Sequence, residues 1–306
     1  MFVQKGDTVA LLSPAGPIPD DLAIKNAQKI LTQWGLKSVV GKNALAKDGH
    51  FAGTDAQRLS DLEEALDNPN VKMIWALRGG YGSVRIVDDI DFTKFIKNPK
   101  LLVGFSDITV LHSKMSQLNI PSLHALMPVQ FKDAIADEVL QQTQNAFFGK
   151  TFDYRFNASK YNKNSQEVSG VVVGGNLANL YSLLGTPLDI DTQDKILFIE
   201  DIGEQLYNID RMMISLKKAG KLANLRALGV GDFTDIPKNT PYFDKTYQEI
   251  ILEHTEDYDY PVFFEVPIGH IPNNYPLLLG EKLKISIIKN EKVQFLQLNK
   301  ADEKVV

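Results

Sequence analysis

The chain contains no cysteine among its 306 residues. This single absence excludes disulfide bonds, thiolate zinc sites and a cysteine nucleophile. Long hydrophobic runs are absent too, since no stretch reaches the ~18 apolar residues of a membrane-spanning helix. The apolar run "TVALL" near the N-terminus is shorter than the core of a secretory signal and leads directly into a proline turn. We therefore expect a soluble, cytoplasmic protein that does not enter a membrane.

Neither sign of charge is in large excess. The formal net charge is −5, and charged residues make up 23% of the chain beside 44% apolar residues. These values are ordinary for a globular protein and give no reason to expect nucleic acid or an anionic membrane as a partner. A chain of this length buries a sizeable core and is expected to form about two domains.

The first half of the chain alternates between short apolar runs and stretches with helical spacing. The runs that predict strands are "DTVALLS", "KSVVG", "VKMIWAL", "LLVGF" and "IPSLHA". Helices are predicted over residues 20–35, over 54–70 with Thr54 as N-cap, from Asp107 onward and near 137–149. This alternation predicts an α/β domain over residues 1–150, a parallel sheet with helices on both faces.

The second half has a different character. Residues 150–170 are polar and rich in turn formers, which predicts a linker. Beyond them lie short strand candidates, predicted helices near 206–220 and 243–255, and a predicted hairpin around Asn290-Glu291. This mixture predicts a second, mixed domain over residues 165–306.

The glycine-rich segment "ALRGGYGSVR" follows a predicted strand. It does not match the dinucleotide-binding pattern, because Arg85 stands at the third glycine position, and it lacks the G-K-[ST] ending of a P-loop. One interpretation is a tight turn. The other uses the close approach that glycine permits, with backbone N–H groups forming part of an oxyanion hole.

Ser106 stands where the predicted strand "LLVGF" meets a predicted helix. Serine is a favoured N-cap residue, and the pattern alone favours that interpretation. The alternative is a nucleophile on a sharp strand-to-helix turn, where the helix N-terminus supplies free N–H groups. Gly104-Phe105-Ser106 matches the first half of the G-x-S-x-G signature, and the residues that follow do not.

A serine nucleophile needs a base and an orienting acid. The chain has five histidines, and His270 closes the apolar strand "PVFFEVPIGH", where it is suited to face a cleft or to serve as a structural residue. Glu200 ends a predicted buried strand, where a carboxylate is costly unless paired, and Asp201 and Glu204 are its competitors. The remaining histidines are expected in a surface loop (His50), in a structural role (His112), after a strand end (His124) and in solvent (His254). No spacing of His and acidic residues indicates a metal site.

Six segments occur in an order that resembles a known family. They are "GDTVALLSPAGPI", "LRGGYGSVRIVDDIDF", "LLVGFSDITVLH", "GGNLANLYSLLGTP", "LFIEDIGEQLYNIDRMM" and "VPIGHIPNN". Together they span about residues 6 to 280 and resemble the LD-carboxypeptidases, serine peptidase family S66. This family includes murein tetrapeptide carboxypeptidases and microcin C self-immunity peptidases.

The resemblance implies a catalytic triad of Ser106, Glu200 and His270. It further implies an oxyanion hole formed by the backbone N–H groups of Asp107 and Gly80. The implied fold is an N-terminal flavodoxin-like domain that carries the serine and a C-terminal domain with a small β-barrel-like core that carries the glutamate and the histidine. The triad would then span the domain boundary. A homodimer is expected, and no cofactor is implied.

The resemblance also implies the substrate, a small peptide whose scissile bond joins an L-centre of lysine or diaminopimelate to a terminal D-alanine. Arg78, Gly79 and Tyr81 of the glycine-rich turn are then candidate substrate-binding residues. Arg78 is suited to a bidentate contact with the terminal carboxylate or, equally, to a salt bridge inside the first domain. One departure concerns His124, which precedes alanine and leucine where the family often has H-G-P.

Three functions follow as hypotheses. The favoured one is a cytoplasmic LD-carboxypeptidase that trims murein tetrapeptide during cell-wall recycling. The second is a microcin-type immunity peptidase that cleaves a peptidyl-nucleotide and needs an aromatic clamp, for which Trp75 and Tyr81 lie near the relevant turn, although Trp75 is predicted to be strand core. The third is a catalytically silent ligand-binding homologue.

Overall fold

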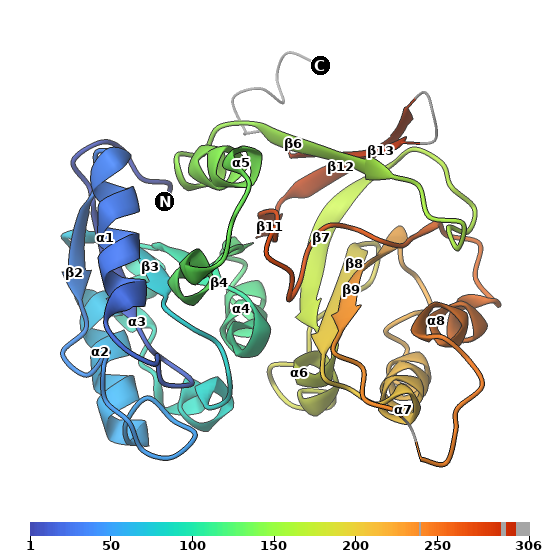
Figure 1. The fold of residues 1–306 in the computed structure, drawn as a ribbon, viewed down its shortest axis with the longest axis horizontal. Helices are drawn as coiled ribbons and strands as arrows, with labels where there is room; N and C mark the ends of the chain where they lie inside the picture. Colours follow the sequence, from blue (N-terminus) through green and yellow to red (C-terminus); the bar gives the residue numbers. More distant parts are fainter. Residues whose placement is uncertain (239, 289–291, 298–306) are drawn as a thin grey trace. The chain divides into compact units, whose positions relative to one another are not determined.

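The computed structural model describes residues 1–238, 240–288 and 292–297. The chain forms two compact units (Figure 1). The first comprises Met1–Lys150 together with Tyr275–Leu278, and the second comprises Thr151–Asn274 and the residues from Leu279 on. Over the described ranges, no helix combines the length and the apolar character needed to cross a membrane.

A six-stranded sheet forms the centre of the first unit. Its strands are β1 (Thr8–Leu12), β2 (Lys37–Val40), β3 (Val71–Ala76), β4 (Leu101–Gly104), β5 (Ser122–His124) and β11 (Leu277–Leu279). The order across the sheet is β11-β5-β4-β3-β1-β2, and neighbouring strands from β2 to β5 run parallel. The order β2-β1-β3-β4-β5 is that of flavodoxin-like folds. The expected parallel-sheet domain is therefore confirmed.

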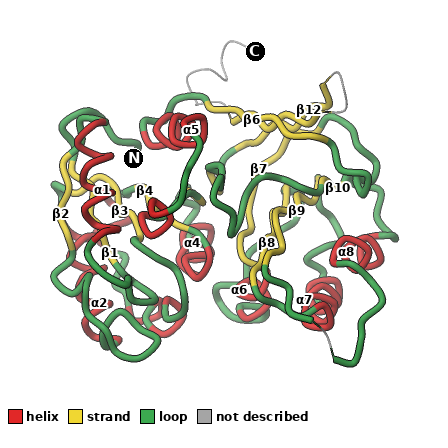
Figure 2. Tube along the Cα trace, in the orientation of Figure 1, coloured by secondary structure: helices red, strands yellow, loops and turns green. Residues whose placement is uncertain are grey.

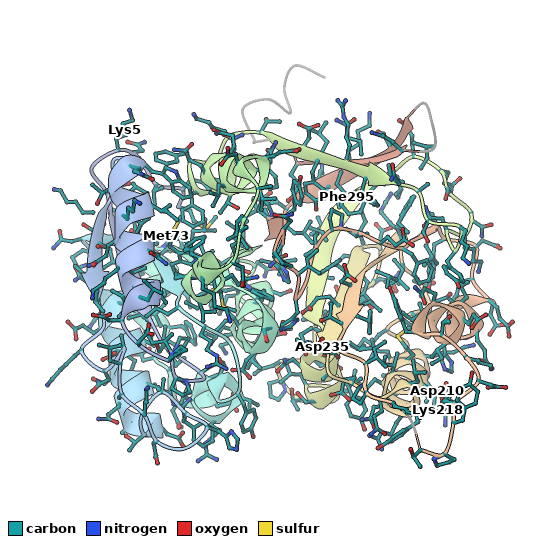
Figure 3. The ribbon with its side chains drawn as sticks, in the orientation of Figure 1. Lys5, Met73, Asp210, Lys218, Asp235 and Phe295 are labelled. Carbon is teal, nitrogen blue, oxygen red and sulfur yellow. The ribbon has the colours of Figure 1, made fainter. Side chains whose placement is uncertain are left out.

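Five α-helices of the first unit cover this sheet: α1 (Leu22–Gln33), α2 (Asp55–Asp67), α3 (Thr93–Lys97), α4 (Thr109–Gln117) and α5 (Asp137–Phe147). On one face Trp75 of β3 packs edge-on against Phe147 of α5, which in turn contacts Trp34 beside α1. On the other face Leu102 of β4 shares an apolar cluster with side chains of α2 and α4. Helices therefore lie on both faces, as predicted, and Met73 is fully buried in this core (Figure 3).

Local sequence explains where α2 begins. Thr54 Oγ1 accepts a hydrogen bond from the Gln57 backbone at 3.2 Å, and Gln57 Oε1 accepts one from the Thr54 backbone at 2.9 Å. This reciprocal pair is a capping box, which satisfies two N–H groups that the helix leaves unpaired. The predicted N-cap at Thr54 is confirmed.

A seven-stranded sheet forms the second unit. Its strands are β6 (Phe152–Asn157), β7 (Val168–Asn176), β8 (Ile196–Ile202), β9 (Ala227–Thr234), β10 (Val262–Phe263), β12 (Lys282–Ile288) and β13 (Lys292–Gln297), in the order β10-β9-β8-β7-β12-β13-β6. Strands β10, β9, β8 and β7 are parallel neighbours, and the remaining pairs are antiparallel. The antiparallel end crosses above the parallel strands (Figure 1), so the sheet curls into a half-barrel. This confirms the barrel-like core that the family resemblance implies.

Helices α6 (Leu177–Ser182), α7 (Leu206–Lys218) and α8 (Tyr247–Thr255) belong to the second unit (Figure 2). Their apolar residues join those of β7, β8 and β9 in one buried cluster. Asn176 caps α6, since its side-chain oxygen accepts from the Asn179 backbone at 3.1 Å. Phe295 of β13 is buried in the antiparallel part (Figure 3).

Two predictions for this region have different outcomes. The predicted linker is wrong in part, because β6 lies inside it and pairs with β13. Phe152 and Tyr154 alternate with polar residues along β6 and are buried, so the polar composition hid a strand of period two. The predicted hairpin is confirmed as the antiparallel pair β12 and β13, and its turn at Asn290-Glu291 lies outside the described residues.

Candidate active site

Three loops of the first unit meet at the carboxyl ends of adjacent parallel strands β1, β3 and β4. Gly16 follows β1, and its N–H donates to the carbonyl of Gly79, which follows β3, at 2.8 Å. A Cβ added to Gly79 would lie 2.8 Å from Ser106 Cβ and 3.0 Å from Ser106 Oγ. The glycine-rich turn therefore lies directly against the serine, at the edge where open α/β sheets bind ligands.

The backbone of Ser106 has a φ of 63°. This left-handed conformation is unusual for a residue other than glycine, costs about 1–3 kcal/mol and is concentrated at functional sites. Ser106 is not an N-cap, because Phe105 holds that position for the 3-10 turn η3 (Ser106–Ile108) and Ile108 holds it for α4. The N-cap interpretation is wrong, and the helix predicted from Asp107 starts as this tight turn. A strained serine between a strand and a helix matches the nucleophile elbow.

Gly104 and His112 explain why the chain turns here. A Cβ on Gly104 would lie 2.9 Å from Ile108 Cγ1, so only glycine lets the turn fold back this tightly. The Gly104 carbonyl accepts a hydrogen bond from His112 Nε2 at 2.9 Å, which leaves His112 Nδ1 to accept one from Ser122 Oγ at 2.8 Å. Burial lowers the pKa of His112 to about 4, so the ring is neutral. The structural role predicted for His112 is confirmed.

The substrate-binding candidates Arg78 and Tyr81 lie beside this serine turn. Arg78 is half-buried and donates to the carbonyl of Pro17 at 2.7 Å. Among the described residues no carboxylate lies within ion-pair distance of Arg78, so the alternative of a salt bridge inside the first domain is not found. Tyr81 is 52% exposed and its ring lies 5.7 Å from that of Phe51. Trp75 is fully buried, as predicted.

In the second unit Glu200 and His270 form a close pair. Glu200 lies near the end of β8 and is 0% exposed, while the side chain of His270 is 14% exposed. His270 Nδ1 and Glu200 Oε2 are 2.7 Å apart. Because an ionised carboxylate only accepts, Nδ1 carries the proton and Nε2 is left with its lone pair. This is the arrangement in which a histidine acts as a general base.

The segment "VPIGHIPNN" positions His270 against Glu200. Gly269 has a φ of +126°, and a Cβ there would lie 3.1 Å from both Glu200 Cβ and Glu200 Oε2. Only glycine therefore lets the loop pack against the buried carboxylate. The Gly269 N–H donates to Asn274 Oδ1 at 3.0 Å, and Asn274 is fully buried. The loop that carries His270 is held on both sides of the histidine.

The charges around His270 set its pKa. Burial of the ring is the largest single influence and lowers this pKa. The charge and hydrogen bond of Glu200, with the charges of Asp201 and Asp235 (Figure 3), outweigh it, so the pKa of His270 lies above its ordinary value of 6.5. Burial and the charge of Glu200 raise the pKa of Asp201 to about 7.

The two competitors of Glu200 have other partners. Asp201 accepts hydrogen bonds from Asn176 Nδ2 at 2.8 Å and from the Ala178 backbone at 2.9 Å, at the start of α6. Glu204 accepts one from Asn208 Nδ2 at 2.8 Å. Neither is the hydrogen-bond partner of the histidine, so Glu200 is the acid of this pair.

The other histidines divide as follows. His50 is exposed, as predicted. The prediction that His254 is solvated is wrong, because it is 8% exposed and its Nε2 lies 2.8 Å from Asp210 Oδ1 of α7. His124 is fully buried at the end of β5, with its ring 5.4 Å from that of Phe105. Phe105 immediately precedes Ser106 in the chain, so the buried ring of His124 lies close to the serine turn.

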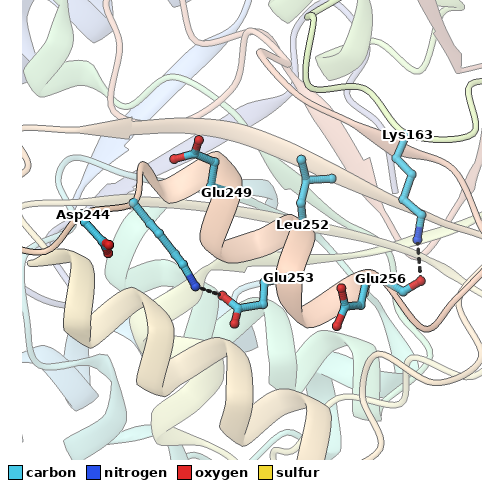
Figure 4. Close-up of a pocket in the computed structure, with 7 residues that line it drawn as sticks. Lys163, Asp244, Glu249, Leu252, Glu253 and Glu256 are labelled. Carbon is cyan, nitrogen blue, oxygen red and sulfur yellow. Dashed lines mark hydrogen bonds and ion pairs between the residues drawn. The ribbon is translucent and has the colours of Figure 1, made fainter.

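A hollow beside α8 is lined mostly by charged side chains: Lys163, Asp244, Lys245, Glu249, Leu252, Glu253 and Glu256 (Figure 4). Its lysines are engaged locally, since Lys245 pairs with Glu253 and Lys163 donates to the Thr255 carbonyl at the end of α8. Within the described part of the chain, no three His, Cys, Asp or Glu side chains are grouped to hold a metal ion. None of the predicted site residues lines this hollow.

Two residues with structured roles beside these sites were missed by sequence reasoning. Arg58 is buried on α2 and donates to the carbonyl of Gly82 in the glycine-rich turn at 2.8 Å. The Asp107 carboxylate, distinct from its backbone N–H, accepts from the Ser83 backbone at 2.8 Å. A sequence signal for Arg58 existed, because it shares the buried stripe of α2 with Leu62 and Ala65.

Comparisons with known proteins match both halves of the chain. Residues 9–125 match the LD-carboxypeptidase N-terminal domain, and residues 169–285 match the LD-carboxypeptidase C-terminal domain. The chain is 35% identical to the probable murein peptide carboxypeptidase of Bacillus subtilis (strain 168), over 92% of this chain and 89% of that protein. It is 26% identical to the microcin C7 self-immunity protein MccF of Escherichia coli, over 92% and 90% of the two chains.

Among solved structures, the muramoyltetrapeptide carboxypeptidase from Oxalobacter formigenes is similar in fold. The TM-score is 0.82 with 28% sequence identity, and the match covers 94% of this chain and 98% of that chain. Both family domains thus occur in order along the chain. The resemblance seen in the six sequence segments is confirmed, and the chain belongs to the LD-carboxypeptidase family.

Proposed function

We propose that this protein is a serine carboxypeptidase that releases the terminal D-alanine from murein tetrapeptide. The bond hydrolysed is the amide between an L-centre, of lysine or diaminopimelate, and D-alanine. The observation that carries the proposal is the pair of His270 Nδ1 and Glu200 Oε2 at 2.7 Å, in a chain whose Ser106 has a φ of 63°. Membership of the LD-carboxypeptidase family and the names of its relatives support the substrate class.

In the proposed mechanism Ser106 Oγ attacks the carbonyl carbon while His270 Nε2 takes its proton. Glu200 holds the imidazole in the required tautomer and stabilises its charged form. The backbone N–H groups of Asp107 and Gly80 donate to the oxyanion of the tetrahedral intermediate. His270 then returns the proton to the amine of the leaving D-alanine. Water attacks the resulting ester by the same steps in reverse and frees Ser106.

Substrate recognition is proposed for the glycine-rich turn. A carboxypeptidase must bind the terminal carboxylate, and a guanidinium does so with two parallel hydrogen bonds. Arg78 is the candidate, because it is half-buried and lacks an ion-pair partner among the described residues. Gly79 and Tyr81 would contact the peptide beside it. A cytoplasmic location and a homodimer belong to the same proposal.

One observation favours a second candidate, a microcin-type peptidase that cleaves a peptidyl-nucleotide. The exposed ring of Tyr81 and the neighbouring ring of Phe51 form an aromatic surface on which a nucleobase could stack. The similarity to MccF supports this alternative. Trp75 cannot contribute to such a surface, because it is fully buried and donates its indole N–H to the Leu126 carbonyl at 2.8 Å.

The test is D-alanine release from L-Ala-γ-D-Glu-L-Lys-D-Ala and from its diaminopimelate counterpart. The matched control peptides end in L-alanine, and aspartyl sulfamoyl adenosine is assayed alongside. We expect release from the peptides ending in D-alanine alone. Cleavage of the nucleotide compound alone would favour the microcin-type function, and no cleavage of any compound would identify a homologue that binds without turnover.

The pH dependence of kcat/KM is a further expected result. His270 must be neutral to accept the serine proton, so kcat/KM should fall about tenfold per pH unit below the pKa of His270. Because that pKa lies above 6.5, the acid limb should start above pH 6.5. Asp201, with its own pKa raised to about 7, carries part of a negative charge in this range, and that charge favours the protonated ring. Asp201→Asn should therefore move the limb to lower pH, by less than about half a unit. The measurement is kcat/KM from pH 5 to 9 for both proteins.

The control for this profile is Asp61→Asn, which alters a buried carboxylate in the first unit. It should leave the acid limb where the wild type has it. The absence of an acid limb in the wild type, or a limb that Asp201→Asn shifts to higher pH, would contradict the proposed role of His270.

A further inference from the structure

The glycine-rich turn beside Ser106 has little conformational restraint of its own. Gly79, Gly80 and Gly82 lack side chains, and Gly80 and Gly82 have φ values of +105° and +140°. Glycine loses more conformational freedom on folding than any other residue, so such a turn adopts one conformation only when its surroundings hold it. The structure shows what holds it.

One peptide group of this turn is bound at both of its polar atoms. The Gly82 carbonyl accepts a hydrogen bond from Arg58 Nη1 at 2.8 Å, and the Ser83 N–H donates one to Asp107 Oδ2 at 2.8 Å. These two atoms belong to the same peptide unit. Arg58 and Asp107 are each 1% exposed, so neither bond is weakened by competing water.

Arg58 is itself held by further contacts. Arg58 also donates to the carbonyl of Pro14 at 3.1 Å, in the loop that follows β1, and forms an ion pair with Asp55. Asp55 pairs at 2.6 Å with Arg85 at the end of the short helix η1 (Ser83–Arg85). The first turns of α2 therefore bind the glycine-rich turn through Arg58. Asp107, which follows Ser106 in the chain, binds the same turn through the Ser83 N–H.

We propose that the side chains of Arg58 and Asp107 are positioning residues that hold the glycine-rich turn against Ser106, so that the turn's N–H groups face the developing oxyanion. This inference rests on the proposed function and deepens it. The side chain of Asp107 thus has a role separate from its backbone N–H, which is a candidate oxyanion donor. Gly82 is needed for the same contact, because a Cβ there would lie 2.5 Å from Arg58 Nη1 and displace the guanidinium.

Asp107 contacts the turn as a hydrogen-bond acceptor, through its Oδ2 atom. Burial raises its pKa, against the hydrogen bonds from Ser83 and Gly82 and the charge of Arg58. A neutral amide of the same shape keeps one oxygen that can accept from the Ser83 N–H. Asp107→Asn should therefore behave like the wild type, whereas Asp107→Ala removes the acceptor.

The test compares Asp107→Ala, Asp107→Asn and Arg58→Lys with the wild type. Oxyanion donors act on the transition state, so misplacing them lowers kcat and spares KM. For Asp107→Ala we expect kcat to fall about 10²-fold, as for loss of one donor, with KM within about threefold. Amide hydrogen exchange of residues 78–86 should accelerate at least about tenfold. Arg58→Lys should move both readouts in the same direction, and Asp107→Asn should restore both.

The matched control is Asp61→Ala. Asp61 is another buried carboxylate of the first unit, and it accepts a hydrogen bond from the Asn43 backbone at 2.8 Å. Its loss should lower the Tm without changing kcat or the exchange of residues 78–86. If Asp107→Ala does not fold, Arg58→Lys supplies the same two readouts.

Two results would overturn the inference: exchange of residues 78–86 that stays at the wild-type rate in both variants, or faster exchange with unchanged kcat. A wild type that releases no D-alanine would instead refute the proposed function. Exchange is measured without substrate, so it judges the anchoring of the turn in either case.

Discussion

Replacing Ser106 with alanine is expected to lower kcat for D-alanine release by about 10⁵–10⁶-fold and to leave KM within a few-fold. The serine hydroxyl is the proposed nucleophile, and without it only direct attack by water remains, aided by the oxyanion donors. Alanine keeps the backbone geometry, so the variant should still bind peptide. D-Alanine release and calorimetric peptide binding, measured on the same preparation, separate loss of chemistry from loss of binding.

The control for this variant is Ser113→Ala, which removes the hydroxyl of a buried serine on α4 and should leave kcat unchanged. Ser106→Gly offers an independent check. Glycine adopts a φ of 63° freely, so this variant should be as inactive as Ser106→Ala and more stable than it by about 1 kcal/mol. Residual kcat within tenfold of the wild type in Ser106→Ala would remove this residue from the mechanism.

Glu200→Gln is expected to lower kcat by about 10⁴-fold with little change in protein stability. Glutamine has the same size, so it fits the buried position at the end of β8. Its amide, however, can donate to His270 Nδ1, which moves the ring proton to Nε2. The ring then presents a donor to Ser106 where the mechanism needs an acceptor. The measurement is kcat together with the nitrogen chemical shifts of His270, which report the tautomer directly.

Glu204→Gln is the matched control for this change. Glu204 follows Glu200 on the same segment and binds Asn208, so its substitution should leave kcat and the His270 tautomer as in the wild type. A Glu200→Gln variant with kcat within tenfold of the wild type would show that the pair of Glu200 and His270 does not orient the base.

The sequence predicted the parts of the fold that depend on local pattern. Strands β1 to β5 and helices α1, α2, α4 and α5 follow from apolar runs and helical spacing, whereas α3 and β11 were not predicted. The capping box at Thr54 is visible in four consecutive residues. Strand β6 was missed, because it is stabilised by pairing with β13, which follows it by more than a hundred residues. His254 was misplaced for the same kind of reason, since its partner Asp210 lies on another helix.

The candidate site, too, could be predicted only where it depends on local sequence. Glu200 and His270 could be singled out because each follows an apolar run, where a buried polar side chain requires a partner. The predicted strand that His270 closes is wrong, because β10 ends at Phe263 and His270 lies in the loop that follows. The conformation of Ser106 could not be predicted from its neighbours, since a cap and an elbow share the same local sequence. What distinguishes them is the approach of Gly79 from the next strand, a contact between parts of the chain that sequence spacing does not encode.

Strand β11 has a consequence for biosynthesis. Residues Tyr275–Leu278 complete the edge of the first sheet beside β5, although the other five strands of that sheet come from the first 150 residues. During translation β5 therefore remains an unpaired edge strand until most of the second unit has been synthesised. Unpaired edge strands can pair with other chains and so promote aggregation. A truncated chain that stops at Lys150 would keep this edge exposed permanently. Cutting the gene at the boundary between the two units would therefore separate the first sheet from its edge strand β11.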